Sequence, residues 1–190
     1  MNPDLPKGAQ LDLYTEKTGV VCNAGGKGNP MDIWTERLER RDLPTLKYWI
    51  GRTSGQLTPC DLPDNPDALP QWYKKCTAEP GRMDCLVLAY ETPIGIAGFQ
   101  RASGQPSMAE FYLMLGEANY NLIRTATYAT LRILDRAFHN YTLVNAKVYG
   151  HHKDYLSVLM RMGFTQISEE GGLVAVNVDK ETFQSRKYLF

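Results

Sequence analysis

The stretch KVYGHHKDYLSVLMRMGF, residues 147–164, decides the fold. It starts as a short β-like run, passes through His151 and His152, and continues as an amphipathic helical pattern. The pattern stops at Gly163, a residue type that is common at helix C-termini. Two interpretations of the adjacent histidines compete. They form a metal or acid–base site, or they lie in the loop between a strand and a helix of a cofactor-binding fold.

The region before this stretch predicts a β-sheet. Residues 83–102, MDCLVLAYETPIGIAGFQRA, place two apolar runs on either side of a turn-like Glu-Thr-Pro, which is the pattern of a hairpin. The next run, MAEFYLMLGE at 108–117, is nearly continuous in apolar residues, as expected of a central strand buried on both faces. We therefore expect three consecutive antiparallel strands between Met83 and Leu115.

A helix and a parallel strand are expected next. Apolar residues recur at helical spacing in RTATYATLRILDRAF, residues 124–138, and Thr125 is available as an N-terminal cap. This helix is expected to cross over to a parallel strand at Asn145–Tyr149. Further helices are predicted at 40–50, 66–78 and 153–162, and further strands at 31–34, 164–168 and 173–179. The order predicts a mixed sheet of the α/β (α+β) class.

The chain is expected to divide at its N-terminal side. Residues 1–30 are interpreted as an N-terminal extension, either a hairpin or flexible, and residues 31–190 as a single domain. The GGKG at 25–28 lacks the serine or threonine and the helix that a phosphate loop requires after its lysine. The segment Thr53–Met83 is expected to be irregular and close to the surface.

Composition excludes several classes of function. Lysines and arginines number 21, as do aspartates and glutamates, so no basic excess indicates nucleic acid as a partner. No apolar run reaches the roughly 20 residues that a membrane helix needs. The N-terminus has no signal-peptide pattern, which makes a cytoplasmic location the expectation. The four cysteines show no C-x-x-C spacing, so neither zinc nor a redox motif is expected.

The order of elements and five motifs resemble the GCN5-related N-acetyltransferase superfamily, over roughly Met31 to Phe183. Within it, the sequence is most similar to the branch that acetylates ribosomal-protein N-termini, amino sugars and small amines. The motifs are RRDLPTLKYWI (40–50), IGIAGF (94–99), FYLMLGEANY (111–120), RTATYATLRILDRAF (124–138) and VLMRMGF (158–164). The resemblance implies a mixed, centrally splayed sheet flanked by helices. It also implies a CoA-dependent N-acyltransferase that uses acetyl-CoA and a primary amine of a small molecule or a peptide.

The resemblance implies a cofactor site between the central strand and the helix after it. A splayed strand leaves backbone groups unpaired, and a helix N-terminus attracts a pyrophosphate. The implied residues are Met114, Leu115 and Gly116 of the strand, Asn121, Arg124, Thr125, Ala126 and Thr127 around the helix start, and His152. His152 occupies the place of a family asparagine that binds the pantetheine arm, so we expect it to face the cofactor and His151 to face away.

The pyrophosphate loop departs from the family pattern. Aligned over 121–126, the central glycine of the family has become Arg124; aligned over 124–129, it has become Thr127. Either substitution weakens the close backbone approach that glycine permits, although Arg124 could contact phosphate directly.

Three residues are candidates for proton transfer. Glu110 and Glu117 bracket the central strand, and Glu117 at its open end is the better placed general base. The acid tyrosine of the family aligns with Leu159, which leaves Tyr155, one turn earlier, as the nearest phenol. A metal at the histidine pair is not expected, because adjacent residues project apart and no carboxylate or cysteine pair stands at ligand spacing.

Two other functions stay open at this point. The chain could be a non-catalytic binding or assembly module that has lost the glycine and the tyrosine, or an enzyme with another acyl donor or reaction in the same cleft. The segment Thr53–Met83 and the first thirty residues are expected to shape the acceptor pocket, because loops carry specificity. The sequence leaves both a monomer and a homodimer open.

Overall fold

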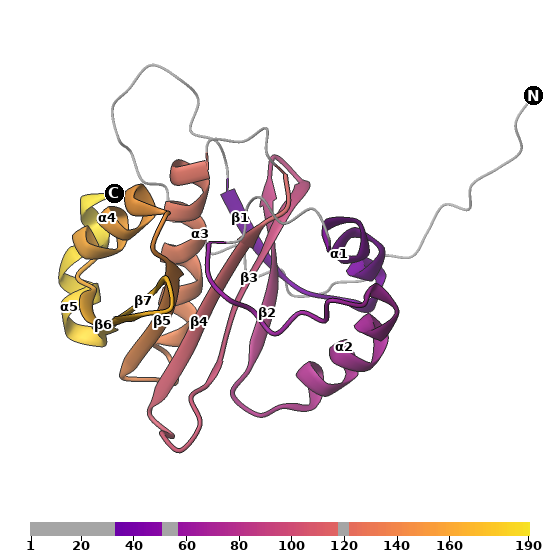
Figure 1. The fold of residues 1–190 in the computed structure, drawn as a ribbon, viewed down its shortest axis with the longest axis horizontal. Helices are drawn as coiled ribbons and strands as arrows, with labels where there is room; N and C mark the ends of the chain where they lie inside the picture. The colour runs from indigo at the N-terminus through magenta and orange to yellow at the C-terminus, as the bar shows by residue number, and fades with distance from the viewer. Residues whose placement is uncertain (1–32, 51–56, 118–121) are drawn as a thin grey trace, which may run out of the picture.

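The computed structural model describes residues 33–50, 57–117 and 122–190 (Figure 1). The expected N-terminal extension of residues 1–30 and the expected cofactor residue Asn121 lie outside these ranges.

Seven strands of the described chain form one mixed sheet in the order β1-β2-β3-β4-β5-β7-β6. Every neighbouring pair is antiparallel except β4 and β5, which are parallel. The strands are β1 (Ile33–Arg37), β2 (Met83–Ala89), β3 (Thr92–Arg101), β4 (Met108–Leu115), β5 (Leu143–Tyr149), β6 (Thr165–Glu170) and β7 (Leu173–Asp179). The expected run of three antiparallel strands is β2, β3 and β4, and the expected parallel strand is β5, so both predictions are confirmed.

Helices cover both faces of this sheet (Figure 1). On one face lie α1 (Leu43–Trp49) and α2 (Leu69–Ala78), and on the other lie α3 (Leu122–Ala137), α4 (Lys153–Arg161) and α5 (Lys180–Arg186). Short 3-10 helices occupy Arg40–Asp42, Pro66–Ala68 and Lys187–Leu189. Within the described ranges, no helix has both the length and the apolar character that crossing a membrane requires.

Two helical details differ from the sequence-based expectation. The crossover helix α3 begins at Leu122, so Thr125 lies inside the helix and is not its cap. Helix α5 was not predicted; it begins where the Asp179 side chain accepts a hydrogen bond from the backbone N–H of Thr182 at 2.8 Å. This is an ordinary N-terminal cap, but seven residues are too few for a clear helical pattern.

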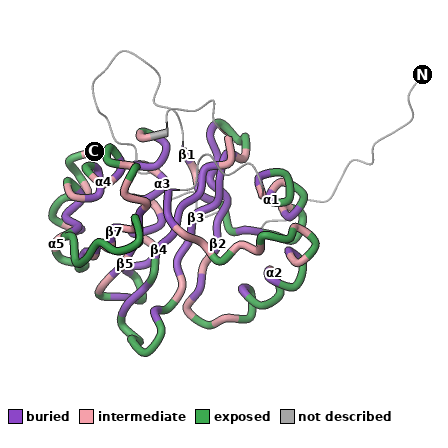
Figure 2. The backbone as a smooth tube through the Cα atoms, in the orientation of Figure 1, coloured by how far each residue is buried: buried purple, intermediate pink, exposed green. Residues whose placement is uncertain are grey.

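Buried side chains form one cluster on each face of the sheet, and the central strands in Figure 2 are accordingly buried over most of their length. In β4, Phe111, Leu113 and Leu115 belong to the larger cluster, with α3 and α4. Tyr112 and Met114 belong to the smaller cluster, with α1 and α2. Burial on both faces explains why this strand reads as a nearly continuous apolar run.

The end of α4 follows the prediction at Gly163. This glycine has φ +102°. Its N–H donates to the Met160 carbonyl, and the Phe164 N–H donates to the Leu159 carbonyl, both at 3.0 Å. These two bonds form a Schellman motif, which requires a left-handed residue at this position. The predicted C-terminal cap is confirmed.

Candidate functional site

The candidate site is the gap between the parallel strands β4 and β5. Their register pairs Met108–Phe111 with Leu143–Ala146 and stops there. Beyond Ala146, β5 continues to Tyr149 alongside β7, and β4 continues to Leu115 alongside β3. The sheet is therefore splayed at its centre, as the family resemblance implied.

Backbone direction decides which groups of β4 face this gap. The Gly116 N–H donates to the Ile94 carbonyl of β3 at 2.8 Å. Because backbone groups alternate along a strand, Met114 also points its N–H and C=O to β3, whereas Leu113 and Leu115 point theirs into the gap. Of the expected cofactor residues Met114, Leu115 and Gly116, only Leu115 thus directs its backbone toward a ligand in the gap.

Part of the gap is filled by Leu57 and Thr58, which we call the bridging segment. Leu113 donates its N–H to Thr58 Oγ1 at 2.7 Å, and its carbonyl accepts the N–H groups of Leu57 at 3.3 Å and Thr58 at 3.2 Å. On the other side, the Tyr149 N–H donates to the Leu57 carbonyl at 3.2 Å. Both residues of the bridging segment are 0% exposed. The expectation that the region from Thr53 lies close to the surface is therefore wrong for these two residues.

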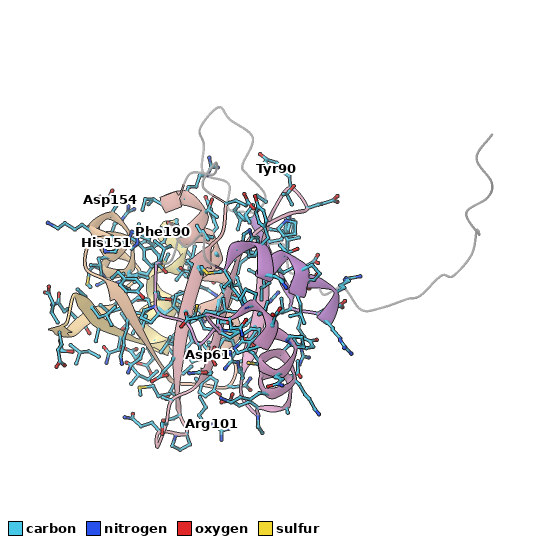
Figure 3. All side chains as sticks on the ribbon, turned by 45° about the vertical axis from the view of Figure 1, so that its right-hand side comes forward. Asp61, Tyr90, Arg101, His151, Asp154 and Phe190 are labelled. Atoms are coloured by element: carbon cyan, nitrogen blue, oxygen red, sulfur yellow. The ribbon has the colours of Figure 1, made fainter. Side chains whose placement is uncertain are left out.

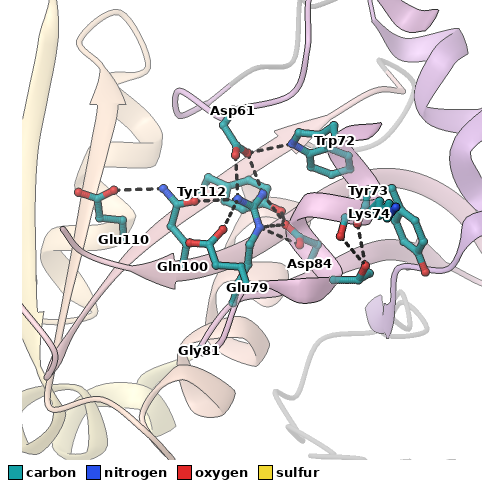
Figure 4. A network of polar contacts seen from close by, with 12 residues as sticks. Asp61, Trp72, Tyr73, Lys74, Glu79, Gly81, Asp84, Gln100, Glu110 and Tyr112 are labelled. Atoms are coloured by element: carbon teal, nitrogen blue, oxygen red, sulfur yellow. Dashed lines mark hydrogen bonds and ion pairs between the residues drawn. The ribbon is translucent and has the colours of Figure 1, made fainter. Parts of the chain in front are cut away.

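A buried charged network fixes the chain just after the bridging segment (Figure 4). Asp61 accepts hydrogen bonds from both terminal nitrogens of Arg82, each at 2.7 Å, and one from the Trp72 indole at 3.3 Å. The Arg82 side chain is only 1% exposed and also pairs with Asp84 at 3.0 Å. The Tyr112 hydroxyl of β4 completes the network by donating to Asp84. The network therefore ties the loop after the bridging segment to β2 and β4.

A hollow of about 270 Å³ lies beside this network, on the face that carries α1 and α2. Its lining includes Asp61, Glu110, Asn145 and Lys147. The Asn145 Oδ1 atom is buried and has no hydrogen-bond partner in the described part of the chain. The hollow is slightly below the usual size of a small-molecule pocket, about 300–1,000 Å³.

The two candidate bases lie at opposite ends of β4. Glu117 lies at the open end, where its Oε1 accepts a hydrogen bond from the Trp49 indole of α1 at 2.9 Å. Glu110 is exposed, and its carboxylate accepts a hydrogen bond from the Gln100 amide at 3.3 Å. They are seven positions apart in an extended stretch of chain, which is about 23 Å, so the two carboxylates cannot serve one reacting centre.

Tyr155 is placed in the core. It is 0% exposed, and its hydroxyl is hydrogen-bonded to Thr130 Oγ1 of α3 at 2.7 Å. Burial raises the pKa of this phenol well above its ordinary value, and this effect outweighs the Thr130 hydrogen bond, which lowers the pKa. A buried phenol of raised pKa is a poor acid for a leaving thiolate. The contacts of Tyr155 support a structural role, joining α4 to α3.

The start of α3 presents fewer ligand groups than expected. Thr125 and Ala126 are 0% exposed and face the core. The Thr127 hydroxyl donates to the Ile123 carbonyl of its own helix at 2.7 Å. Arg124 is exposed, with its guanidinium 6.0 Å from the centre of the Tyr128 ring. A side-chain contact from Ala126 to pyrophosphate is not compatible with its burial, whereas Arg124 stands at the surface near the helix N-terminus.

The histidine pair lies where β5 passes into α4. His152 precedes the helix at its N-cap position, and its N–H donates to the Tyr149 carbonyl at 2.9 Å. The rings of His151 and His152 are 4.1 Å apart, so the argument that adjacent side chains project apart does not hold here. No group of three potential metal ligands occurs among the described residues. Figure 3 shows His151 and Asp154 together at the end of the molecule where α4 begins, with Asp61 over the middle of the sheet.

The fold is that of the GCN5-related N-acetyltransferases: a splayed mixed sheet with a crossover helix between its two central parallel strands. The spermidine N-acetyltransferase of Vibrio cholerae, solved with CoA and spermine, is 16% identical to this chain. The match covers 83% of this chain and 98% of the acetyltransferase, with a TM-score of 0.66. RimJ of Mycobacterium smegmatis, solved with CoA-disulfide, is 14% identical to this chain. The match covers 83% of this chain and 86% of RimJ, with a TM-score of 0.64. The N-acetyltransferase PseH of Campylobacter jejuni is 17% identical to this chain. The match covers 80% of this chain and 99% of PseH, with a TM-score of 0.58. No protein-family profile and no curated protein sequence matches the chain.

Sequence reasoning missed the parts of the site that depend on distant contacts. Leu57 and Thr58 lie in a loop whose composition carries no helical or strand periodicity. The Trp49–Glu117 hydrogen bond joins residues 68 positions apart. The sequence offers only an apolar residue followed by a hydroxyl residue at 57–58, and two residues are too few to define a periodic pattern.

Proposed function

We propose that the chain is a CoA-dependent N-acyltransferase, with acetyl-CoA as donor and a primary amine of a small molecule or a peptide as acceptor. The observation that carries the proposal is the divergence of β4 from β5 beyond Phe111, next to the N-terminus of α3. An extended pantetheine arm can pair with such a strand edge, and a pyrophosphate suits a helix N-terminus. The first turn of α3 contains no acidic residue that would repel it. The likeness to proteins solved with CoA supports the same class of donor.

Each chemical step has a candidate group in this chain. The amine nitrogen attacks the thioester carbonyl, the new C–N bond forms, and the C–S bond breaks to release the CoA thiolate. The Leu115 N–H, which points into the gap, is our candidate for polarising the carbonyl oxygen. Glu117 is our candidate base, acting through water on the amine proton, with its orientation held by Trp49. Arg124 and His152 are our candidates for phosphate and pantetheine contacts.

The two glutamates of β4 provide a matched test of the base. Glu117→Gln keeps an oxygen that can accept the Trp49 hydrogen bond, so the fold should tolerate it. Turnover of acetyl-CoA with an accepted amine should fall about 10²–10⁴-fold, the usual contribution of a general base. Glu110→Gln, at the other end of the strand, should leave turnover within about twofold. Equal effects at both positions would refute the assignment of Glu117.

Donor binding has its own test. Acetyl-CoA should raise the melting temperature of the protein in a concentration-dependent way, because a ligand that binds the folded state stabilises it. Arg124→Glu should weaken this shift, because it places negative charge beside the expected pyrophosphate. Ala126→Glu is not a suitable test, since Ala126 is buried and the variant would disturb the core.

The histidines give a second, finer test of the donor site. His152→Ala should weaken acetyl-CoA binding by up to about tenfold, the value of one direct hydrogen bond. His151→Ala, its neighbour in the same loop, is the control and should change binding little. If both variants lost the same affinity for acetyl-CoA, the effect would come from the loop and not from the His152 ring, and His152 would be removed from the proposed site.

A second candidate function, a non-catalytic module of the same fold, is favoured by one observation. The bridging segment occupies the gap, with Leu57 and Thr58 both 0% exposed. The decisive experiment measures acetyl-CoA binding by calorimetry and then thiol release with a panel of amines. Binding together with release supports the enzyme, and binding without release on any amine supports the module. No binding at millimolar acetyl-CoA would refute the acyltransferase.

A further inference from the structure

The bridging segment uses the backbone groups that a ligand in the gap would need. The Leu113 N–H has Thr58 Oγ1 as its partner, and the Leu113 carbonyl accepts from both N–H groups of the segment. Leu57 bridges to β5 through the Tyr149 N–H. A backbone group has few bonding positions, so an extended arm cannot pair with β4 at Leu113 while Thr58 stays bound.

The segment also occupies space in the gap. Leu57 belongs to the main core cluster together with Leu113 and Leu115, the two β4 residues whose backbone faces the gap. Interiors are close-packed, so a ligand arm and the Leu57 side chain cannot both fit between β4 and β5. A donor that lies fully in the gap must first displace this residue.

The chain is held firmly on the C-terminal side of the segment. Asp61, three residues after Thr58, is fixed by two hydrogen bonds from Arg82 and one from Trp72. Breaking that attachment would leave the almost fully buried Arg82 without one of its two closest carboxylates, which is unfavourable. The short connection Pro59–Cys60 is therefore where the backbone would turn if Leu57 and Thr58 left the gap and Asp61 stayed.

We propose that Leu57 and Thr58 occupy the acyl-donor groove in the free protein, and that acyl-CoA binds by displacing them. This inference rests on the proposed acyltransferase function. The apparent dissociation constant for the donor is then the intrinsic constant divided by the fraction of molecules in which the segment has left the gap. Any substitution that weakens the segment without touching the donor should strengthen donor binding.

The test compares two substitutions at Thr58. Thr58→Val keeps the shape of the side chain and removes the hydroxyl that accepts the Leu113 N–H, whereas Thr58→Ser keeps a hydroxyl. With acetyl-CoA titrated by calorimetry, the valine variant should bind about two- to tenfold more tightly than the parent, the range expected for one lost hydrogen bond. The serine variant keeps the hydrogen bond but loses a buried methyl group, so its gain in affinity should be smaller than that of the valine variant. The melting temperature of the valine variant without ligand should be lower.

Hydrogen exchange supplies an independent measurement on the unchanged protein. Acetyl-CoA should make the amides of Leu57 and Thr58 exchange faster, because both now donate to Leu113 and would lose that partner. Ligands ordinarily slow exchange, so acceleration confined to a peptide that covers the segment would be specific to displacement.

The outcomes separate the two claims. If the parent binds acetyl-CoA but Thr58→Val binds it equally or more weakly, and exchange at Leu57 does not accelerate, the displacement is refuted and the acyltransferase proposal stands. If neither protein binds acetyl-CoA at millimolar concentration, both are refuted. Tighter binding by the valine variant, with accelerated exchange in the parent, supports both.

Discussion

The buried Arg82 is the residue whose removal should destabilise the protein most clearly. Its guanidinium pairs with Asp61 at 2.7 Å and Asp84 at 3.0 Å and also donates to Gln100 at 2.8 Å. Arg82→Met keeps much of the side-chain volume and removes the charge. The Asp84 side chain, 8% exposed, would keep only its hydrogen bond from Tyr112 among these partners. A buried carboxylate would thus lose its counter-charge.

The expected magnitude follows from that unpaired charge. Removing one member of a buried ion pair costs about 3–5 kcal/mol. At roughly 2–4 °C per kcal/mol for a protein of this size, the melting temperature should fall by about 6–20 °C. Urea unfolding at neutral pH, followed by tryptophan fluorescence, measures the free energy directly. The double variant Arg82→Met/Asp84→Asn should recover most of the loss, because the uncompensated charge is then absent.

The cost should also depend on pH in a defined direction. Burial raises the pKa of Asp61, but the hydrogen bond and the charge of Arg82 act in the opposite direction and outweigh it. The pKa of Asp61 therefore lies below the ordinary 3.8. In the parent, ionised Asp61 therefore adds stability above pH 3.8, and this addition is lost as the pH falls through the lowered pKa. Arg82→Met lacks it at every pH, so the difference between parent and variant should narrow on acidification.

A matched control makes the result interpretable. Arg101 lies at the exposed end of β3 (Figure 3), and Arg101→Met should change stability by less than about 0.5 kcal/mol. A loss below about 1 kcal/mol for Arg82→Met, or one equal to that of the control, would refute the view that this network holds the loop after the bridging segment in place.

Three further outcomes are expected. Tyr155→Phe should lower the free energy of unfolding by about 0.5–1.5 kcal/mol through its lost bond to Thr130, with kcat unchanged in the thiol-release assay; a large fall in kcat would restore Tyr155 as the acid. Gly163→Ala should cost about 1 kcal/mol or more in urea unfolding, because φ is +102° and its Cβ would lie 2.5 Å from Thr182 Cγ2. Cys85 should resist iodoacetamide at pH 8 in the folded protein, because burial raises its pKa to about 11; rapid labelling detected by mass spectrometry would contradict its placement in the core.

The elements that the sequence predicts well are those whose own pattern is sufficient. β4 reads as apolar throughout because both of its faces are buried, and α3 reads as a helix because one face packs on the sheet over 16 residues. Gly163 is recognisable as a helix end because the left-handed residue that follows many helices is usually glycine. In each case the signal lies within the element and needs no distant partner.

The site was less predictable because its contacts link distant parts of the chain. Thr125 and Ala126 are good residues for a helix start, but the start lies three positions earlier and turns both into the core. Tyr155 is a plausible acid by position along the chain, and only its neighbour Thr130 on another helix reveals a structural role. A sequence pattern gives the residue type and not the direction in which the side chain points.

The bridging segment supplies hydrogen-bond partners for the backbone groups that the splayed sheet leaves unpaired. A splay exposes the backbone of β4, and an unpaired backbone group in a buried position costs about 1–3 kcal/mol. In the free protein the Leu113 N–H and carbonyl would carry that cost, but Thr58 and Leu57 satisfy both. Burial of the Leu57 side chain adds about 1.5–3 kcal/mol to the closed arrangement. If the proposed displacement holds, the same contacts that stabilise the free fold oppose the donor, and the affinity for acyl-CoA is set as much by residues 57 and 58 as by any residue that touches the ligand.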